Sequence, residues 1–158
     1  MRLLADAMLG SLARWLRVLG YDTLYDPNWN DHELIRVARA EGRVLLTRDR
    51  ELLRRRNVRV VWITSEHWEE QVRQVLRELP LPPPAPFSRC LVCNEPLIPV
   101  SRSEAWGLVP PYVFVTHDQF SMCPECNQFY WRGTHWNHME ETIAALCQAW
   151  RGPAEESS

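Results

Sequence analysis

The chain has 158 residues, of which 46% are hydrophobic and 24% are charged, and its formal net charge is -2. This size and composition predict one globular domain with its own core plus a small appendage, and they exclude a disordered protein. No apolar run reaches the roughly 20 residues of a membrane span, and Arg2 and Asp6 argue against a signal peptide. We therefore expect a soluble, cytoplasmic protein.

The charges are distributed unevenly along the chain. Residues 1–80 carry 14 arginines against 12 acidic residues, whereas residues 81–158 carry 4 arginines against 8 acidic residues. All 18 basic residues are arginine, for which the simplest explanation is genomic base composition. Whatever its origin, this choice provides planar, forked donors that suit phosphate groups.

Strand and helix patterns alternate through the first 79 residues. Short apolar runs such as Val44-Leu45-Leu46 are typical of buried parallel strands, and segments with a single apolar stripe indicate helices between them. The expected elements, in chain order, are a strand at 3–5, a helix between Asp6 and Gly20, a weak strand at 21–25, a helix at 32–41, a strand at 44–46, a short helix at about 50–56, a strand at 58–63 and a helix ending near Leu79. This order predicts a three-layer α/β unit with a mostly parallel sheet.

Several residues mark where the helices should begin and end. Asn30 and Glu33 have the spacing of an asparagine version of a capping box, and Gly42 is expected to end the helix that follows. Ser65 is expected to cap the last helix of this unit. Arg17 falls on the polar side of the first helix, which predicts a solvated position.

A proline-rich stretch separates the α/β unit from the rest of the chain. Five prolines lie between residues 80 and 86, and such a segment forms a stiff, extended spacer. We therefore expect an α/β unit over 1–79, a linker over 80–87, a small second segment with a C-terminal helix over 88–150, and a disordered tail over 151–158.

The cysteines indicate a metal site. They are Cys90, Cys93, Cys123, Cys126 and Cys147. The first four form two C-x-x-C pairs, which predict a zinc ribbon whose four thiolates hold one structural Zn²⁺ and supply folding energy that so small a segment lacks. His135 and His138 also have ligand spacing, but four thiolates already satisfy zinc. Cys147 falls on the apolar stripe of a final helix and is expected to be a core residue.

Carboxylates collect where the predicted strands end. Asp6 and Asp49 each follow a strand, and Asp31 lies in the first turn of the second helix. In open α/β sheets, chemistry takes place beyond the carboxyl ends of the strands. Three such carboxylates would repel one another unless they shared a divalent cation, and hard oxygen ligands suit Mg²⁺ or Mn²⁺. These ions support hydrolysis of phosphodiester bonds.

Other interpretations of these residues remain open. Asp49 has the position of a simple helix cap, and Asp22 and Asp26 fit turn residues better than ligands. The sequence after Asp6, A-M-L-G, contains neither a G-x-G-x-x-G nor a G-x-x-x-x-G-K-[ST] loop, and no G-x-S-x-G elbow occurs in the chain. Nucleotide binding through those loops and hydrolysis by such a serine are therefore unsupported.

The arginines are ambiguous by sequence alone. Arg14, on the helix after Asp6, and Arg48, inside the T-R-D triplet, are candidates for holding a polyanion beside the acidic residues. The cluster Arg54-Arg55-Arg56 is expected to be ordinary surface.

Three stretches of the first unit resemble the Mut-seven C-terminal PIN-like RNase domain. They are D-A-M-L-G-S-L-A-R-W-L-R-V-L-G-Y-D-T, D-H-E-L and E-G-R-V-L-L-T-R-D-R-E-L. The pairs C-L-V-C and C-P-E-C and the tail Y-W-R-G-T-H-W-N-H-M resemble the zinc ribbon of that family. The resemblance implies a PIN-like fold, metal-dependent RNase activity and three acidic site residues, Asp6, Asp31 and Asp49. It also places the Thr47 hydroxyl beside them, and Glu66 is a loose match to a further acid.

The favoured function is a Mg²⁺- or Mn²⁺-dependent ribonuclease whose partner is RNA. The alternative is a non-catalytic RNA-binding or regulatory module with a vestigial acidic site, and a third possibility is a toxin of a toxin–antitoxin pair, against which the appended ribbon argues. The similarity around G-T-H-W-N-H-M leads us to expect that His135 contacts the catalytic unit or the substrate path; packing within the ribbon is the alternative.

Overall fold

A computed structural model describes residues 1–131 and 134–152, with the backbone alone for residues 134–138. The first part of the chain forms, in order, β1 (Leu3–Ala5), α1 (Gly10–Val18), β2 (Thr23–Tyr25), α2 (Asp31–Glu41), β3 (Val44–Thr47), the 3₁₀ turn η1 (Arg50–Arg54), β4 (Val60–Trp62) and α3 (Trp68–Glu78). The second part forms β5 (Ile98–Val100), α4 (Arg102–Ala105), α5 (Pro111–Thr116), β6 (Phe120–Met122), β7 (Phe129–Trp131) and α6 (Thr134–Cys147).

The first part is built on a parallel four-stranded sheet with the order β2-β1-β3-β4. The two central strands, β1 and β3, are buried along their whole length, which is the pattern of strands covered on both faces. The predicted α/β fold class with a mostly parallel sheet is therefore confirmed.

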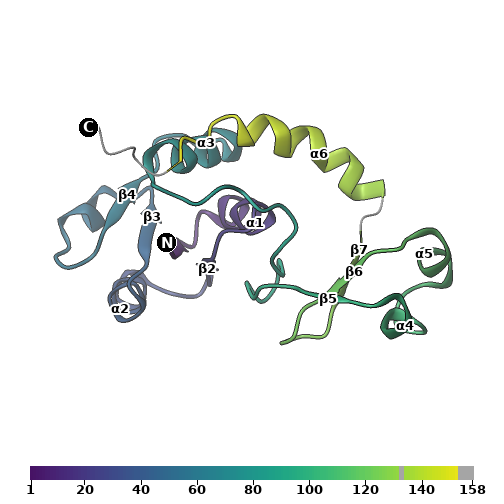
Figure 1. The fold of residues 1–158 in the computed structure, drawn as a ribbon. Helices are drawn as coiled ribbons and strands as arrows, with labels where there is room; N and C mark the ends of the chain where they lie inside the picture. The colour runs from purple at the N-terminus through teal and green to yellow at the C-terminus, as the bar shows by residue number, and fades with distance from the viewer. Residues whose placement is uncertain (132–133, 153–158) are drawn as a thin grey trace, which may run out of the picture.

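Alternating side chains of the central strands supply two separate cores. Leu3 and Leu46 contribute to a core shared with α1, α3 and α6, whereas Leu4 and Leu45 pack against α2 and η1 on the opposite face. In Figure 1, α3 and α6 run along one side of the molecule and α2 lies on the other. These two cores make the three layers.

The ends of the helices match the sequence signals in part. Asn30 accepts a hydrogen bond from the Glu33 amide at 2.9 Å, and Gly42 ends α2 with a φ of 64°. The expected cap at Ser65 is wrong: its hydroxyl accepts the His67 amide at 3.0 Å in a turn that precedes α3. Because α3 begins at Trp68, its N-cap position is His67, two residues beyond Ser65.

The expected helix at about 50–56 is a single 3₁₀ turn that ends at Arg54. The Asp49 side chain accepts the amide of Glu51, only two residues ahead, and 3₁₀ geometry is used in such short pieces.

The proline-rich segment is attached to the end of α1. The amides of Ala85 and Phe87 donate to the carbonyls of Leu19 and Val18, both at 2.8 Å, and the Tyr21 hydroxyl donates to the Pro82 carbonyl at 2.9 Å. The extended backbone of this segment therefore lies against the α/β unit.

The second part begins with an antiparallel sheet of the order β5-β6-β7, which has its own small core around Val113 and Phe120. After this sheet, α6 returns to pack on α3, so that Ile143 and Leu146 join the core of the first part. The Trp150 indole nitrogen donates to the Leu81 carbonyl at 2.9 Å. In the predicted tail, residues 153–158 lie outside the described residues.

Candidate functional site

Two aspartates meet at the carboxyl edge of the parallel sheet because β1 and β3 are neighbours. Ala5 pairs with Leu46, and the Asp6 amide donates to the Leu46 carbonyl at 3.0 Å. The next residue on β3, Thr47, is completely buried and donates its hydroxyl to Asp6 Oδ2 at 2.7 Å. The same hydroxyl oxygen accepts the Asp49 amide at 3.0 Å. Thr47 therefore links Asp6 to the backbone of Asp49.

A third carboxylate reaches this edge from the first turn of α2. Partial burial raises the pKa of Asp31, and the nearby negative charges of Asp49 and Asp6 raise it further. A hydrogen bond with the Asp49 side chain acts in the same direction, because such a bond needs a proton on one of the two carboxyl groups. Asp31 therefore lies near enough to Asp49 and Asp6 for their charges to act on its carboxyl group.

Asp49 also makes the contact expected of a cap. Its Oδ1 accepts the Glu51 amide at 2.9 Å at the start of η1. The contact to Glu51 occupies one lone-pair direction of one oxygen, and a carboxylate offers about four. Capping and a second role for Asp49 are therefore compatible.

The other acidic candidates lie elsewhere. Asp22 precedes β2 at the opposite edge of the sheet, where its Oδ1 accepts Arg43 Nη1 at 2.8 Å. Asp26 closes its own turn by accepting the Asn28 amide at 2.9 Å, as expected of a turn residue. Glu66 is 84% exposed in its side chain, and its Oε1 lies 4.0 Å from Arg48 Nη2.

The arginine candidates differ in how they are held. Arg48 is part-buried and donates to the Ile63 carbonyl at 3.1 Å, while its own carbonyl accepts the Trp62 indole N–H at 3.1 Å. Arg14 is exposed on α1 and makes no hydrogen bond or ion pair with any residue that the structure describes. It lines a hollow of about 360 Å³ together with Tyr25 and Tyr130. The prediction for His135 falls on a side chain outside the described residues.

The four cysteines of the two C-x-x-C pairs come together as one cluster. The ligand atoms of Cys90, Cys93, Cys123 and Cys126 all lie within 4.8 Å of one another. Sulfur atoms around a tetrahedral zinc, with Zn–S bonds of about 2.3 Å, are separated by about 3.8 Å. The Sγ atoms of Cys90 and Cys126 are 3.9 Å apart. The donor set and its spacing therefore fit Zn²⁺.

Each cysteine pair is shaped by the asparagine that follows it. The amides of Asn94 and Asn127 donate to the carbonyls of Cys90 and Cys123, at 3.0 and 2.8 Å. Both asparagines have a positive φ, 64° and 59°, which asparagine tolerates better than most residues. Within the described residues, this cluster is the one group of three or more potential ligands whose ligand atoms all lie within 4.8 Å of one another; the three aspartates are less tightly gathered.

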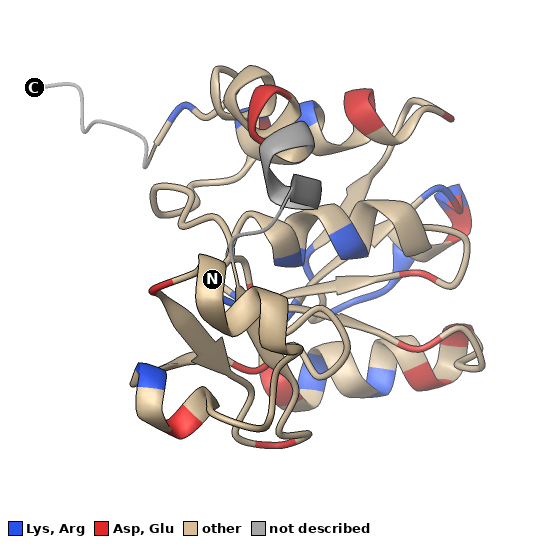
Figure 2. Cartoon of the chain, turned by 90° about the vertical axis from the view of Figure 1, so that its right-hand side faces the viewer, with Lys and Arg blue, Asp and Glu red and all other residues tan. Residues whose placement is uncertain are grey.

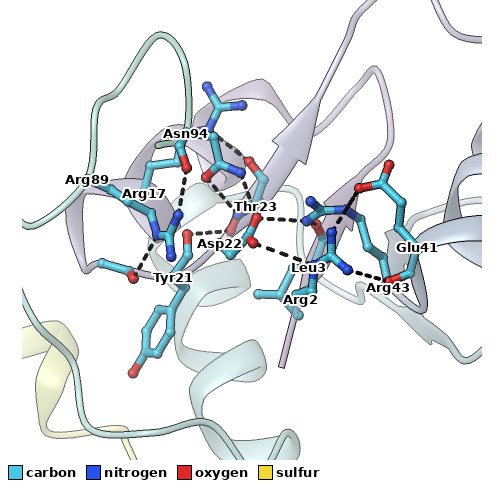
Figure 3. Close-up of polar contacts among 11 residues, drawn as sticks. Arg2, Leu3, Arg17, Tyr21, Asp22, Thr23, Glu41, Arg43, Arg89 and Asn94 are labelled. Carbon is cyan, nitrogen blue, oxygen red and sulfur yellow. Dashed lines mark hydrogen bonds and ion pairs between the residues drawn. The ribbon is translucent and has the colours of Figure 1, made fainter. Parts of the chain in front are cut away.

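The first cysteine pair is bound to the α/β unit by a buried polar network (Figure 3). Asn94 accepts the Thr23 amide at 2.9 Å and donates to Asp22 Oδ1 at 2.6 Å. Arg17 Nε donates to the Thr23 carbonyl, and its Nη1 donates to the Leu91 carbonyl, both at 2.8 Å. Arg17 is only 8% exposed, so the predicted solvated position is wrong.

The network continues across the sheet and perturbs Asp22. Burial alone would raise the pKa of Asp22, but hydrogen bonds from Arg43 and Asn94 and the positive charge of Arg43 outweigh it, so the pKa is lowered. Arg43 is itself buried and also bonds the Leu3 carbonyl at 2.9 Å. Sequence reasoning missed Arg17, Arg43 and Asn94; the repeated C-x-x-C-N pattern was the available signal for Asn94.

A protein-family model matches most of the chain. The model of the Mut7-C RNAse domain matches residues 1–143. The chain belongs to the Mut7-C RNAse domain family. No match was found among curated proteins or among solved structures. Membership in this RNase family supports a nuclease-like function, and the cysteine cluster supports a structural metal. None of the helices in the described residues has the length and apolar character to cross a membrane.

Proposed function

We propose that this Mut7-C domain is a ribonuclease that hydrolyses RNA phosphodiester bonds with a divalent cation, Mg²⁺ or Mn²⁺, held by Asp6, Asp31 and Asp49. Two observations carry the proposal: the Thr47 hydroxyl links the Asp6 carboxylate to the backbone of Asp49 at the carboxyl edge of β1 and β3, and Asp31 lies near enough for the charges of both to raise its pKa, together with its partial burial. This is the edge at which α/β proteins bind their ligands.

The electrostatics of the three carboxylates support a cation. Partial burial is the largest cause of the raised pKa of Asp31, and the negative charges of Asp49 and Asp6 add to it; a divalent ion would neutralise that charge. Mg²⁺ usually keeps several waters and takes only one or two carboxylates plus substrate phosphate, so a loose carboxylate group suits it. The bound ion would supply an activated water and charge stabilisation at the phosphate.

The surrounding residues hold the carboxylates in place. Thr47 donates to Asp6 Oδ2, which leaves Asp6 Oδ1 free to act as a ligand, and the Glu51 amide fixes one oxygen of Asp49. We propose Arg14 and Arg48 as substrate-binding residues, because Arg14 has unengaged donors and Arg48 lies one residue from Asp49. We propose the same for His135 on the family resemblance alone.

Zn²⁺ at Cys90, Cys93, Cys123 and Cys126 has a structural role in this proposal. We infer that the protein is cytoplasmic, a compartment in which the thiolates of the four cysteines are kept reduced.

Replacing Asp49 by asparagine tests the proposal. Asparagine caps as well as aspartate, so η1 should persist, whereas one ligand charge is lost. Cleavage of a mixed RNA substrate with added Mg²⁺ or Mn²⁺ should fall by orders of magnitude, and the melting temperature without added divalent ions should hold or rise. Unchanged cleavage by Asp49→Asn would exclude this site.

A non-catalytic RNA-binding module is the second candidate, favoured by the capping contact of Asp49 and the looser packing of the carboxylates. It predicts RNA binding by the wild-type protein without cleavage under any of these ions.

A further inference from the structure

A groove along the outer side of α2 is lined by basic residues. It has a volume of about 620 Å³, and its lining residues are His32, Ile35, Arg36, Arg39, Ala40 and Arg55. A second groove of about 620 Å³ shares Arg39 with the first and includes Arg59. None of the described residues that line either groove is acidic. We call the two together the basic groove.

The walls of the basic groove are held by Arg39. Its Nε and Nη2 atoms donate to the Arg56 carbonyl at 3.1 and 2.6 Å, which fastens α2 to the turn after η1. That turn contains Asn57 with a φ of 62°. The guanidinium groups of Arg36 and Arg55 make no hydrogen bond or ion pair with any described residue, so their donors are available to a ligand.

The basic groove begins beside the acidic edge of the sheet. His32 directly follows Asp31 in α2, and Arg55 is near enough for its charge to lower the pKa of Asp31, against the larger raising effects. With a rise of 1.5 Å per residue, Arg36 lies about 7.5 Å from Asp31 along the helix axis, and Arg39 about 12 Å. These separations are on the order of one and two nucleotide steps from a phosphate at the carboxylates.

The basic groove is a local feature of the surface. Seen from the side on which α4 and α5 lie, positive and negative residues are interleaved over helices and loops (Figure 2). On the opposite face of the sheet, a pocket beside α3 is lined by Arg77 together with Glu70 and Glu78. A general attraction of polyanions to the whole molecule, whose net charge is -2, is therefore not expected.

We propose that the basic groove binds the backbone of a single-stranded RNA next to the bond that is cut, with Arg36 and Arg55 contacting its phosphates. The inference rests on the proposed function for the place of the cut, and it adds the path of the strand. Such phosphate contacts supply affinity without sequence preference, and each releases counterions.

The test compares two double variants in the Asp49→Asn background, in which RNA is not consumed. Arg36→Gln/Arg55→Gln removes two charges from the groove. Arg77→Gln/Arg151→Gln removes the same charge from exposed positions at α3 and after α6, on the other face of the sheet. The zinc-loaded proteins are titrated into a fluorescent 12-nucleotide RNA, and anisotropy is measured at several salt concentrations.

The groove variant should bind the RNA about tenfold more weakly at low salt. The slope of log K against log salt should become shallower by about 1.4, because two single-strand phosphate contacts contribute about 0.7 each. The control variant should keep its affinity within twofold and keep its slope.

Equal behaviour of the two double variants, or no RNA binding by their parent, would overturn the inference. Cleavage by wild-type protein is measured separately. If the groove variant binds RNA more weakly but the wild-type protein never cleaves RNA, only the ribonuclease proposal is rejected. If the wild-type protein cleaves RNA but the groove variant binds it as tightly as its parent does, only the proposed path of the strand is rejected.

Discussion

Replacing Asn94 by glycine removes the side chain that joins the first cysteine pair to β2, while the backbone keeps its conformation. The φ of 64° costs glycine nothing. Two hydrogen bonds are lost: the one that Asn94 Oδ1 accepts from the Thr23 amide, and the one that its Nδ2 donates to Asp22.

The size of the destabilisation depends on which hydrogen bonds Thr23 and Asp22 keep after the Asn94 side chain is removed. Thr23 is completely buried, and an unsatisfied buried N–H costs about 1–3 kcal/mol. Asp22 retains its bond from Arg43 and a side chain that is 22% exposed, so its loss is smaller, about 1 kcal/mol. The expected decrease in the free energy of unfolding is therefore about 2–4 kcal/mol, beyond the roughly 0.5–1 kcal/mol for a flexible glycine in the unfolded chain.

Asn127→Gly is the matched control. Asn127 follows the second cysteine pair with a φ of 59°, but it is exposed, and its side chain makes no hydrogen bond with any described residue. It should therefore show the glycine contribution alone. Urea unfolding of both zinc-loaded variants at neutral pH gives the comparison. Equal destabilisation of the two variants would show that Asn94 does not anchor the cysteine pair.

Three further predictions concern the metal, the proline-rich segment over 80–87 and the acidic edge. Elemental analysis should find one zinc per chain, and Cys93→Ser should lose it and make residues 88–131 sensitive to protease; an ordered zinc-free segment would contradict this. Gly20→Ala should lower the free energy of unfolding by about 2–4 kcal/mol, because at Gly20 (φ 91°) an added Cβ would lie 2.4 Å from the Ala85 carbonyl oxygen. Gly42→Ala should lower it by only about 1 kcal/mol, because nothing lies within 4 Å of a Cβ added there. Equal unfolding energies would reject the close approach. Because the pKa of Asp31 is raised in the folded protein, protonation of Asp31 should stabilise the fold at acidic pH without divalent ions, and this stabilisation should be lost as the pH rises through the raised pKa. Asp31→Asn should remove this pH dependence of the free energy of unfolding. An unchanged pH profile of unfolding in the variant would refute the prediction.

The acidic edge could be predicted from sequence because it depends on local signals. A strand that ends at Ala5 and another that ends at Thr47 place Asp6 and Asp49 at one edge as soon as the sheet is parallel and the strands are neighbours. The capping contact of Asn30 with Glu33 is local in the same way.

Contacts between distant parts of the chain could not be predicted in this way. Arg17 has the spacing of a polar helix face, yet its guanidinium group donates a hydrogen bond to the carbonyl of Leu91, which is 74 residues away in the sequence. The apolar stripe of α6 predicted a helix but not that α3 would be its partner. Arg55 lies in a run of three arginines that predicts plain surface, and only the packing of α2 against the turn at Arg56 makes a groove of it.

The attachments of the second part to the first differ in whether they need the metal. The proline-rich segment over 80–87 and the packing of α6 on α3 use backbone hydrogen bonds and apolar contacts in which none of the four cysteines of the metal cluster takes part. The contact through Asn94 depends on the shape of the first cysteine pair, which thiolates bound to zinc would maintain. Zinc and the Asn94 side chain should therefore stabilise the same contact. The effect of Asn94→Gly on unfolding should be largest in zinc-loaded protein and should shrink when the metal is removed, whereas the effect of Gly20→Ala should remain. An Asn94→Gly effect of the same size with and without zinc would mean that the cysteine pair keeps its shape without the metal.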